Sequence, residues 1–201
     1  IIMATDKGVA DVALVSVRRG SPSYNGQIIV RAGSGINALA DLKGKVFARV
    51  DPVSTSGWII PDIMMRAAGV NPERDLKQIL DGGSHDGVVT ADYSGDADAG
   101  GCYVDARTRV EKQFPDVMEK VLVLEVSLDI PNDGVQFSPA VPKEMRDKIV
   151  QALLEIAQSE EGKKALSTAY QWDGLIQADN TFYDPFRQIL QAAGIDPASK
   201  L

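Results

Sequence analysis

Short runs of Val and Ile alternate with amphipathic stretches along most of the chain. The first two runs span residues 12–17 and 27–31, and a turn signature at 19–22 (Arg-Gly-Ser-Pro) separates them. This spacing predicts two strands joined by a loop. The pattern further predicts a helical turn over 36–45, strands over 46–50, 77–80, 98–103 and 121–126, and helices over 57–68, 85–93 and 105–114. Because strands alternate with helices, we expect an α/β fold with a parallel sheet and helices on its faces.

The last third of the chain changes to a helical composition. A turn cluster at 131–134 and a brief extended segment at 135–137 precede a helix that is expected behind Pro142. Ser159 can cap a second helix, and a third is expected to end at Gly194. The apolar positions at helical spacing in the first of these helices are Met145, Ile149, Leu153 and Ile156. Three amphipathic helices with almost no strand of their own can cover only the strands at the N-terminal end.

Two α/β lobes, one inserted into the other, follow from this pattern. Residues 1–32 and 136–201 are expected to form lobe one, and residues 33–135 are expected to form lobe two, with two crossings between them. Residues 1–4 (Ile-Ile-Met-Ala) resemble the middle of a buried element and carry no start signal. We therefore expect an N-terminally truncated or processed piece, in which the first part of lobe one is missing.

Charge and composition narrow the classes of partner. The 201 residues include 21 Lys and Arg against 28 Asp and Glu, a net charge of −7, with no basic run. Nucleic-acid binding is therefore not expected. One cysteine, Cys102, and one histidine, His85, can form neither an intrachain disulfide nor a tetrahedral zinc site, so we predict no metal and no cofactor. No apolar stretch approaches the roughly 18 residues that cross a bilayer, so no direct membrane insertion is expected.

Residues 51–57 (Asp-Pro-Val-Ser-Thr-Ser-Gly) stand between a predicted strand and a predicted helix. They place the hydroxyl groups of Ser54, Thr55 and Ser56 and several unpaired N–H groups at a positive helix N-terminus, which favours an oxyanion. The alternative is simple N-capping by the same side chains. The Gly-x-x-x-x-Gly-Lys pattern of nucleotide-binding phosphate loops is absent.

Residues 82–86 (Gly-Gly-Ser-His-Asp) repeat this arrangement after the next strand. In an open α/β sheet, both turns lie at the carboxyl ends of neighbouring strands, where ligands bind. At a helix start, the ring of His85 can donate a hydrogen bond to an anion, although a cap or a surface position is the alternative. We expect the two turns to face one crevice.

Tyr103 and Asp105 stand at the end of the next strand, and Asp133 at the end of the one after it. Either acid can instead be a helix cap or a turn residue. An acid beside an anion site repels the ligand unless the ligand carries an ammonium group or a protonated oxygen, so the two acids suggest a zwitterionic or hydrogen-bearing oxyanion. A hydrolase triad of His85, Ser54 or Ser56, and Asp133 is a further alternative, but the Gly-x-Ser-x-Gly nucleophile elbow is missing.

Taken in order, several stretches resemble the phosphonate/phosphate/phosphite-binding periplasmic proteins of ABC transporters, over residues 12–195. They are residues 21–24 (Ser-Pro-Ser-Tyr), 27–31, 36–45, 51–57, 69–72 (Gly-Val-Asn-Pro) and 83–86 (Gly-Ser-His-Asp). The resemblance implies a type II periplasmic binding fold that closes on its ligand. It assigns Ser54, Thr55, Ser56 and His85 to the phosphorus oxyanion, and Asp105 and Asp133 to its substituent.

The resemblance also implies a function. The chain would be the solute-binding component of an ABC importer, which captures a phosphonate, phosphite or phosphate between its lobes without catalysis. Its partner would be the transporter permease, and its location would be periplasmic or lipid-anchored, through a signal sequence absent from this chain. A sensing domain of a signalling protein and an enzyme on the same fold stay open as alternatives. With a phosphorus oxyanion as ligand, Asp105 and Asp133 favour an aminoalkylphosphonate, in particular because Asp105 stands across the crevice from residues 54–56. Members with an aminoalkyl ligand often carry Glu in place of Asp105, so the ligand stays open among the phosphorus oxyanions.

Overall fold

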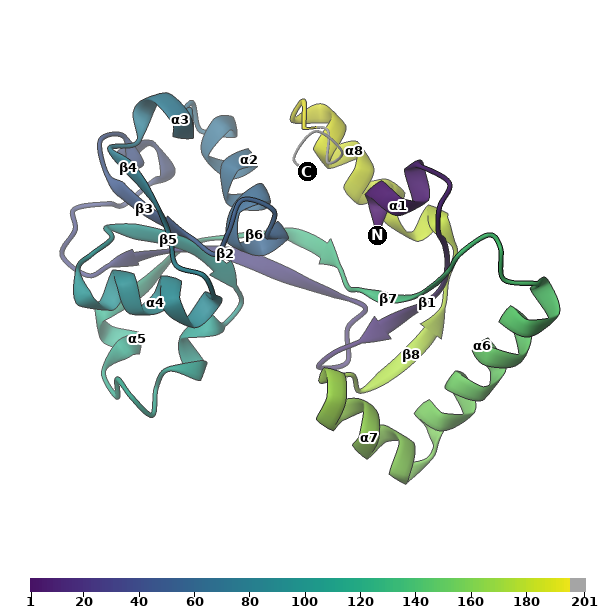
Figure 1. Ribbon diagram of the computed structural model, residues 1–201. Coiled ribbons are helices and arrows are strands. Elements are labelled where there is room, and N and C mark those ends of the chain that lie inside the picture. Colours follow the sequence, from purple (N-terminus) through teal and green to yellow (C-terminus); the bar gives the residue numbers. More distant parts are fainter. Residues whose placement is uncertain (196–201) are drawn as a thin grey trace. The chain divides into compact units, whose positions relative to one another are not determined.

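The computed structural model describes residues 1–195, so the predicted end of lobe one at 196–201 lies outside the described residues. The chain divides into two compact units (Figure 1). Unit 1 combines Ile1–Tyr24 with Ile130–Leu201, and unit 2 is Asn25–Asp129. Within residues 1–195, no helix is long and apolar enough to cross a membrane.

Unit 2 contains a mixed five-stranded sheet. Its strands, in spatial order, are β4 (Gln78–Asp81), β3 (Val46–Arg49), β5 (Ala99–Tyr103), β2 (Ser23–Arg31) and β6 (Val121–Pro131). β3 pairs in parallel with β4 and β5, as expected, whereas β2 pairs antiparallel with β5. The prediction of a wholly parallel sheet is therefore wrong at β2. Three consecutive buried residues, Ile28, Ile29 and Val30, suit a central strand of either direction, so the pattern does not encode strand polarity.

Helical segments of unit 2 cover both faces of this sheet (Figure 1). They are the 3₁₀ turn η1 (Leu39–Leu42), the π-helical turn η2 (Thr55–Ile59), α2 (Ile60–Ala67), α3 (Pro72–Asp75), α4 (His85–Ser94), the 3₁₀ turn η3 (Ala106–Arg109) and α5 (Val117–Lys120). Ile28 packs with Trp58 and Met65 on one face, and its neighbour Ile29 packs with Val88 on the other. This alternation follows from the period of two along a strand.

The predicted helix over 105–114 is wrong beyond its first turn. Only Ala106–Arg109 is helical, as a 3₁₀ turn, and the chain continues in turns to residue 116. Pro115 disfavours helical backbone at the preceding Phe114, which opposes a helix that reaches the predicted end at 114.

Unit 1 contains a three-stranded antiparallel sheet in the order β7 (Gly134–Phe137), β1 (Asp11–Val17) and β8 (Gly174–Gln177). Its helical segments are α1 (Ile2–Asp6), α6 (Lys143–Gln158), α7 (Glu160–Tyr170), the 3₁₀ turn η4 (Asn180–Tyr183) and α8 (Asp184–Ala192). The sequence pattern missed β8, because four residues with two apolar side chains give little signal until β1 pairs with them. The helical last third of the chain therefore contains a strand, β8, between α7 and η4.

Of the stripe predicted for α6, only Leu153 packs against the core. Val150, Leu153, Leu154 and Ala157 pack against Leu14 and Trp172, while Met145, Ile149 and Ile156 are exposed. Both stripes are apolar at helical spacing, so only contact with β1 and α7 decides which one faces the core.

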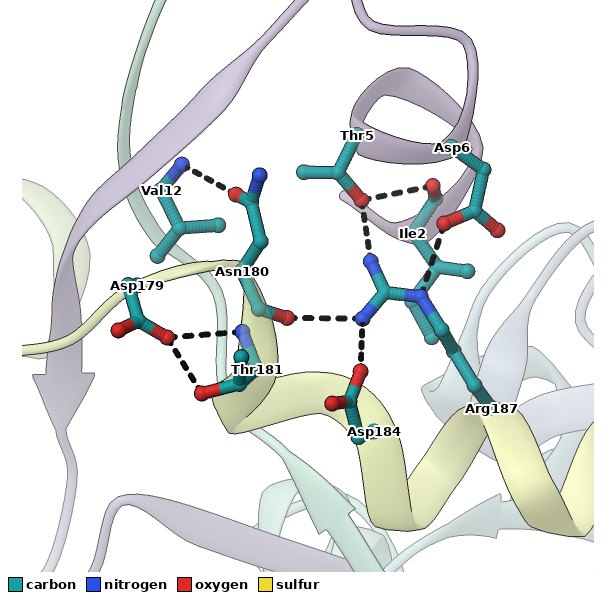
Figure 2. A network of polar contacts seen from close by, with 9 residues as sticks. All are labelled: Ile2, Thr5, Asp6, Val12, Asp179, Asn180, Thr181, Asp184 and Arg187. Carbon is teal, nitrogen blue, oxygen red and sulfur yellow. Dashed lines mark hydrogen bonds and ion pairs between the residues drawn. The ribbon is translucent and has the colours of Figure 1, made fainter.

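Arg187 ties α8 to α1 within unit 1 (Figure 2). Its Nε donates to Asp6 at 2.8 Å, and its two terminal nitrogens donate to Thr5, to Asp184 and to the carbonyl of Asn180 at 2.5–2.7 Å. The Asn180 side chain accepts a hydrogen bond from Val12 N at 2.9 Å. The contacts of Arg187 with Thr5 and Asp6 span 182 and 181 positions, and that of Val12 with Asn180 spans 168, so they tie the two ends of the described chain together.

Two boundary segments differ from the predicted lobes. Residues 25–32 belong to unit 2, not lobe one, because β2 pairs along Gly26–Val30 with β5. Residues 130–135 belong to unit 1, not lobe two, because β7 begins at Gly134 and pairs with β1. Strand pairing, which a local pattern does not show, decides both boundaries.

Candidate oxyanion site

The turns that follow β3 and β4 lie against each other at one edge of the unit 2 sheet. The N–H of Gly82 donates to Arg49 O at 2.7 Å, and the N–H of Gly83 donates to Val50 O at 3.0 Å. Because β3, β4 and β5 are parallel, their carboxyl ends share this edge. The geometry confirms the expected neighbourhood of the two turns.

The turn after β3 leads into η2, and hydrogen bonds from its own backbone hold the side chains of Asp51 and Ser54. Ser54 is the N-cap, and its Oγ accepts a hydrogen bond from Gly57 N at 3.2 Å, so the capping alternative holds for this residue. The side chain of Asp51 accepts hydrogen bonds from Val53 N and Ser54 N, both at 2.8 Å.

Thr55 and Ser56 stand at the first two positions of η2. Within residues 1–195, their N–H and hydroxyl groups have no hydrogen-bond partner. Thr55 is half-buried, and Ser56 is buried beside Gly26, the residue of β2 that pairs with Tyr103. Unpaired donors at a helix start form an anion-binding arrangement.

His85 is the first residue of α4 and contacts Tyr103 at the end of β5. The two rings meet edge to face with centroids 4.7 Å apart, and Tyr103 N donates to His85 Nδ1 at 3.4 Å. Burial lowers the pKa of His85, although the nearby Asp86 acts to raise it. The ring is therefore neutral at pH 7, and because Nδ1 accepts a hydrogen bond, its proton is on Nε2. A neutral donor at Nε2 suits an oxyanion ligand.

This arrangement differs from a hydrolase triad. In a triad, the histidine Nδ1–H donates to a carboxylate, whereas Nδ1 of His85 accepts from a backbone amide. The hydroxyl of Ser54 is engaged in its cap.

Asp105 caps η3 and is surrounded by donors. Its carboxylate accepts hydrogen bonds from the backbone N–H and guanidinium of Arg107 and from Gln27 Nε2 at 3.1 Å. Burial acts to raise the pKa of Asp105, but the hydrogen bonds from Arg107 and Gln27 outweigh it and lower the pKa. Asp105 is ionised at neutral pH as half of an ion pair.

Asp133 lies in unit 1. The predicted boundary at 135 had instead placed it in lobe two. Its carboxylate accepts from Ser16 Oγ and from Arg18, each at 2.9 Å. Six of the seven predicted site residues lie at or just after the carboxyl ends of β3, β4 and β5 in unit 2, and Asp133 belongs to the other unit. The six are Ser54, Thr55, Ser56, His85, Tyr103 and Asp105.

Gln27 and Arg107 contact Asp105 at this edge and were not among the predicted site residues. Gln27 is 1% exposed although it is polar, and it stands at the start of an Ile-Ile-Val run. A buried polar residue in a central strand needs a partner, and this signal could have identified Gln27. Arg107 gave no such signal, because a charged residue after a predicted cap is ordinary on a surface.

Two further observations concern metal ions and pockets. Within residues 1–195, no group of three His, Cys, Asp or Glu side chains could hold a metal ion. A surface pocket of unit 1 is lined by Ala13, Gln177, Ala178, Asp179, Thr181 and Phe182, none of them a predicted site residue.

The family of ABC-transporter phosphonate periplasmic substrate-binding proteins matches residues 1–183. The chain belongs to this family. It is 25% identical over 174 residues to a phosphonates-binding periplasmic protein of Escherichia coli, covering 85% of this chain and 51% of that protein. It is 35% identical over 95 residues to a phosphate-import protein of Mycolicibacterium smegmatis, covering 44% of this chain and 30% of that protein. The match of this family member therefore spans about half of the length of the first relative and less than a third of the second.

Solved structures show the same fold. A binding protein component of an ABC phosphonate transporter from Pseudomonas aeruginosa superposes with a TM-score of 0.79 at 24% identity, over 95% of this chain and 65% of that one. A protein from Prochlorococcus marinus in complex with methylphosphonate gives a TM-score of 0.72 at 18% identity, over 90% of this chain and 71% of that one. The family member described here has the type II periplasmic binding fold.

Proposed function

We propose that this chain is the solute-binding part of an ABC importer and binds a phosphonate, phosphite or phosphate at the described edge of unit 2. Its partner is the transporter permease, its location is periplasmic, and it carries out no catalysis. Membership of the phosphonate-binding family and the phosphonate and phosphate named for its relatives support the ligand class.

One observation carries the assignment of the site. The unpaired N–H and hydroxyl groups of Thr55 and Ser56 stand on the turn after β3, and the neutral His85 stands on the adjoining turn after β4. Several neutral donors at one sheet edge can surround an oxyanion without bringing a counter-charge of their own.

Replacing His85 tests this site directly. Hydrogen bonds to a charged group contribute about 1.5–3 kcal/mol each, so His85→Ala should weaken methylphosphonate binding by about tenfold or more in titration calorimetry. Ser94→Ala, at the exposed opposite end of α4, is the matched control and should bind like the wild type. Equal affinities of the His85→Ala variant and the wild type would remove His85 from the site.

A second measurement separates a binding protein from an enzyme. Methylphosphonate incubated with the protein should stay intact by phosphorus NMR over hours, while the melting temperature rises with ligand concentration because the ligand binds only the native state. Release of phosphate that disappears in the His85→Ala variant would instead assign catalysis to this chain.

A further inference from the structure

Three aspartates around the candidate oxyanion site each form an ion pair with an arginine. At the ends of β3 and β4, Arg49 Nε donates to Asp81 at 2.6 Å. At the start of α4, Asp86 accepts from Arg109, also at 2.6 Å. After β5, Arg107 and Asp105 approach to 2.5 Å. Each of these pairs is electrically neutral as a unit, so none offers a free negative charge to a ligand.

The pair after β5 is the most completely bonded of the three. Oδ1 of Asp105 accepts from Gln27 Nε2 at 3.1 Å, from Arg107 N at 3.1 Å and from Arg107 Nε at 2.9 Å, while Oδ2 accepts from Arg107 at 2.5 Å. The side chains of Asp105 and Arg107 are 24% and 14% exposed. A carboxylate oxygen has about two lone-pair sites, so Oδ1 is already saturated.

Arg107 is also fixed from its other side. Its remaining terminal nitrogen donates to Val121 O at 2.8 Å, and Val121 is the first residue of β6. The pair thus joins β5 to β2 through Gln27 and to β6 through Val121. A ligand ammonium that recruited Asp105 would have to break these bonds and leave the mostly buried Arg107 guanidinium without its partner, which is costly.

The one remaining acid on these turns is also engaged. Asp51 accepts two backbone N–H groups as the cap of its own turn. By contrast, the donors of Thr55 and Ser56 and the Nε2 proton of His85 are not used by the acids. The edge therefore offers donors to an anion, and each of its four carboxylates is already engaged by an arginine or by backbone N–H groups.

We infer that this edge takes a phosphorus oxyanion whose substituent carries no ammonium group, such as an alkylphosphonate, phosphite or phosphate. The inference rests on the proposed function and replaces the expectation of an aminoalkylphosphonate that Asp105 and Asp133 had suggested. In unit 1, Asp133 is likewise paired, with Arg18 and Ser16.

Two ligands that differ only in the ammonium group provide the test. Titration calorimetry on the wild-type protein should show ethylphosphonate binding at least about tenfold more tightly than 2-aminoethylphosphonate, because the ammonium must lose its hydration without gaining a partner. Equal or tighter binding of 2-aminoethylphosphonate would overturn the inference and leave the proposed function standing. Binding of neither ligand, with no rise in melting temperature, would overturn the proposed function itself.

The Asp105→Asn variant provides a second test, in which the ratio of the two affinities is measured. This ratio does not depend on how stable the variant is. It should change the affinities for both ligands by the same factor, so that their ratio stays that of the wild type. A melting curve identifies how much protein is folded. Selective loss of 2-aminoethylphosphonate binding in Asp105→Asn would show that this acid contacts the ammonium, which contradicts the inference.

Discussion

Replacing Gly101 with alanine is expected to destabilise unit 2 and to weaken oxyanion binding together. Gly101 lies in β5 directly beneath the start of η2. A Cβ at this position would stand 2.7 Å from Pro61 Cγ and 2.8 Å from Gly57 O. A backbone carbonyl cannot move aside without displacing the turn that holds Thr55 and Ser56. Overpacking of this kind costs about 1–3 kcal/mol.

Urea unfolding followed by circular dichroism measures the loss of stability, and titration with methylphosphonate measures the loss of affinity. Gly174→Ala in β8 is the matched control, because the nearest atom to its added Cβ would be Val17 Cβ at 4.0 Å. The control should unfold and bind as the wild type does. A Gly101→Ala variant with wild-type stability and affinity would show that η2 is not seated on β5 in this way.

In the wild-type protein, the free energy of unfolding is expected to fall as pH rises because of Asp92. Replacing Asp92 with asparagine is expected to abolish this fall. Asp92 lies in α4, is fully buried, and, among the described residues, neither of its carboxylate oxygens has a hydrogen-bond partner. Burial raises its pKa well above the ordinary value of 3.8, the nearby Asp98 raises it further, and Arg31 acts to lower it. The native state therefore keeps a proton that the unfolded chain releases.

The sign of the effect follows from proton linkage. Above pH 3.8 the unfolded state binds fewer protons at this position than the native state, so the free energy of unfolding falls as pH rises. The slope is about 1.4 kcal/mol per pH unit and continues until the pH passes the native pKa. Stability from this group is thus complete below the unfolded pKa and is lost as pH rises through the native pKa.

Unfolding curves from pH 4 to pH 8 measure this term. Asp92→Asn cannot ionise, so it should lose the slope and be more stable than the wild type at pH 8 by at least about 1.4 kcal/mol, the equivalent of one pKa unit. Asp96→Asn, in the exposed turn after α4, should keep the wild-type pH profile. A wild-type slope in Asp92→Asn would show that another group is responsible.

The sequence predicted the local features of the candidate site well. Ser54 caps the turn after β3, and His85 opens the helix after β4, as the polar turns indicated. Cys102 is a buried thiol inside a strand, and burial raises its pKa to about 12, in agreement with its reading as a small apolar residue. Caps and buried runs depend on neighbours within a few positions, which is why a linear pattern contains them.

The role of Asp105 shows the limit of such a pattern. Its capping of η3 was one of the alternatives open from sequence, because the partner N–H is only two residues away, on Arg107. Its contact with Gln27 spans 78 positions, and the contact of Arg107 with Val121 spans 14. These contacts decide whether the carboxylate is free for a ligand.

The sequence by itself determined the family, the order of most strands and helices, and the two polar turns that carry the candidate oxyanion site. Only the tertiary structure decided the antiparallel direction of β2, the existence of β8, the buried stripe of α6 and the neutralisation of Asp105. The physical reason is the same in each case. Strand direction, the choice between two apolar stripes and the charge left on an acid all depend on groups that approach from distant parts of the chain. Periodicity and capping report only the groups nearby.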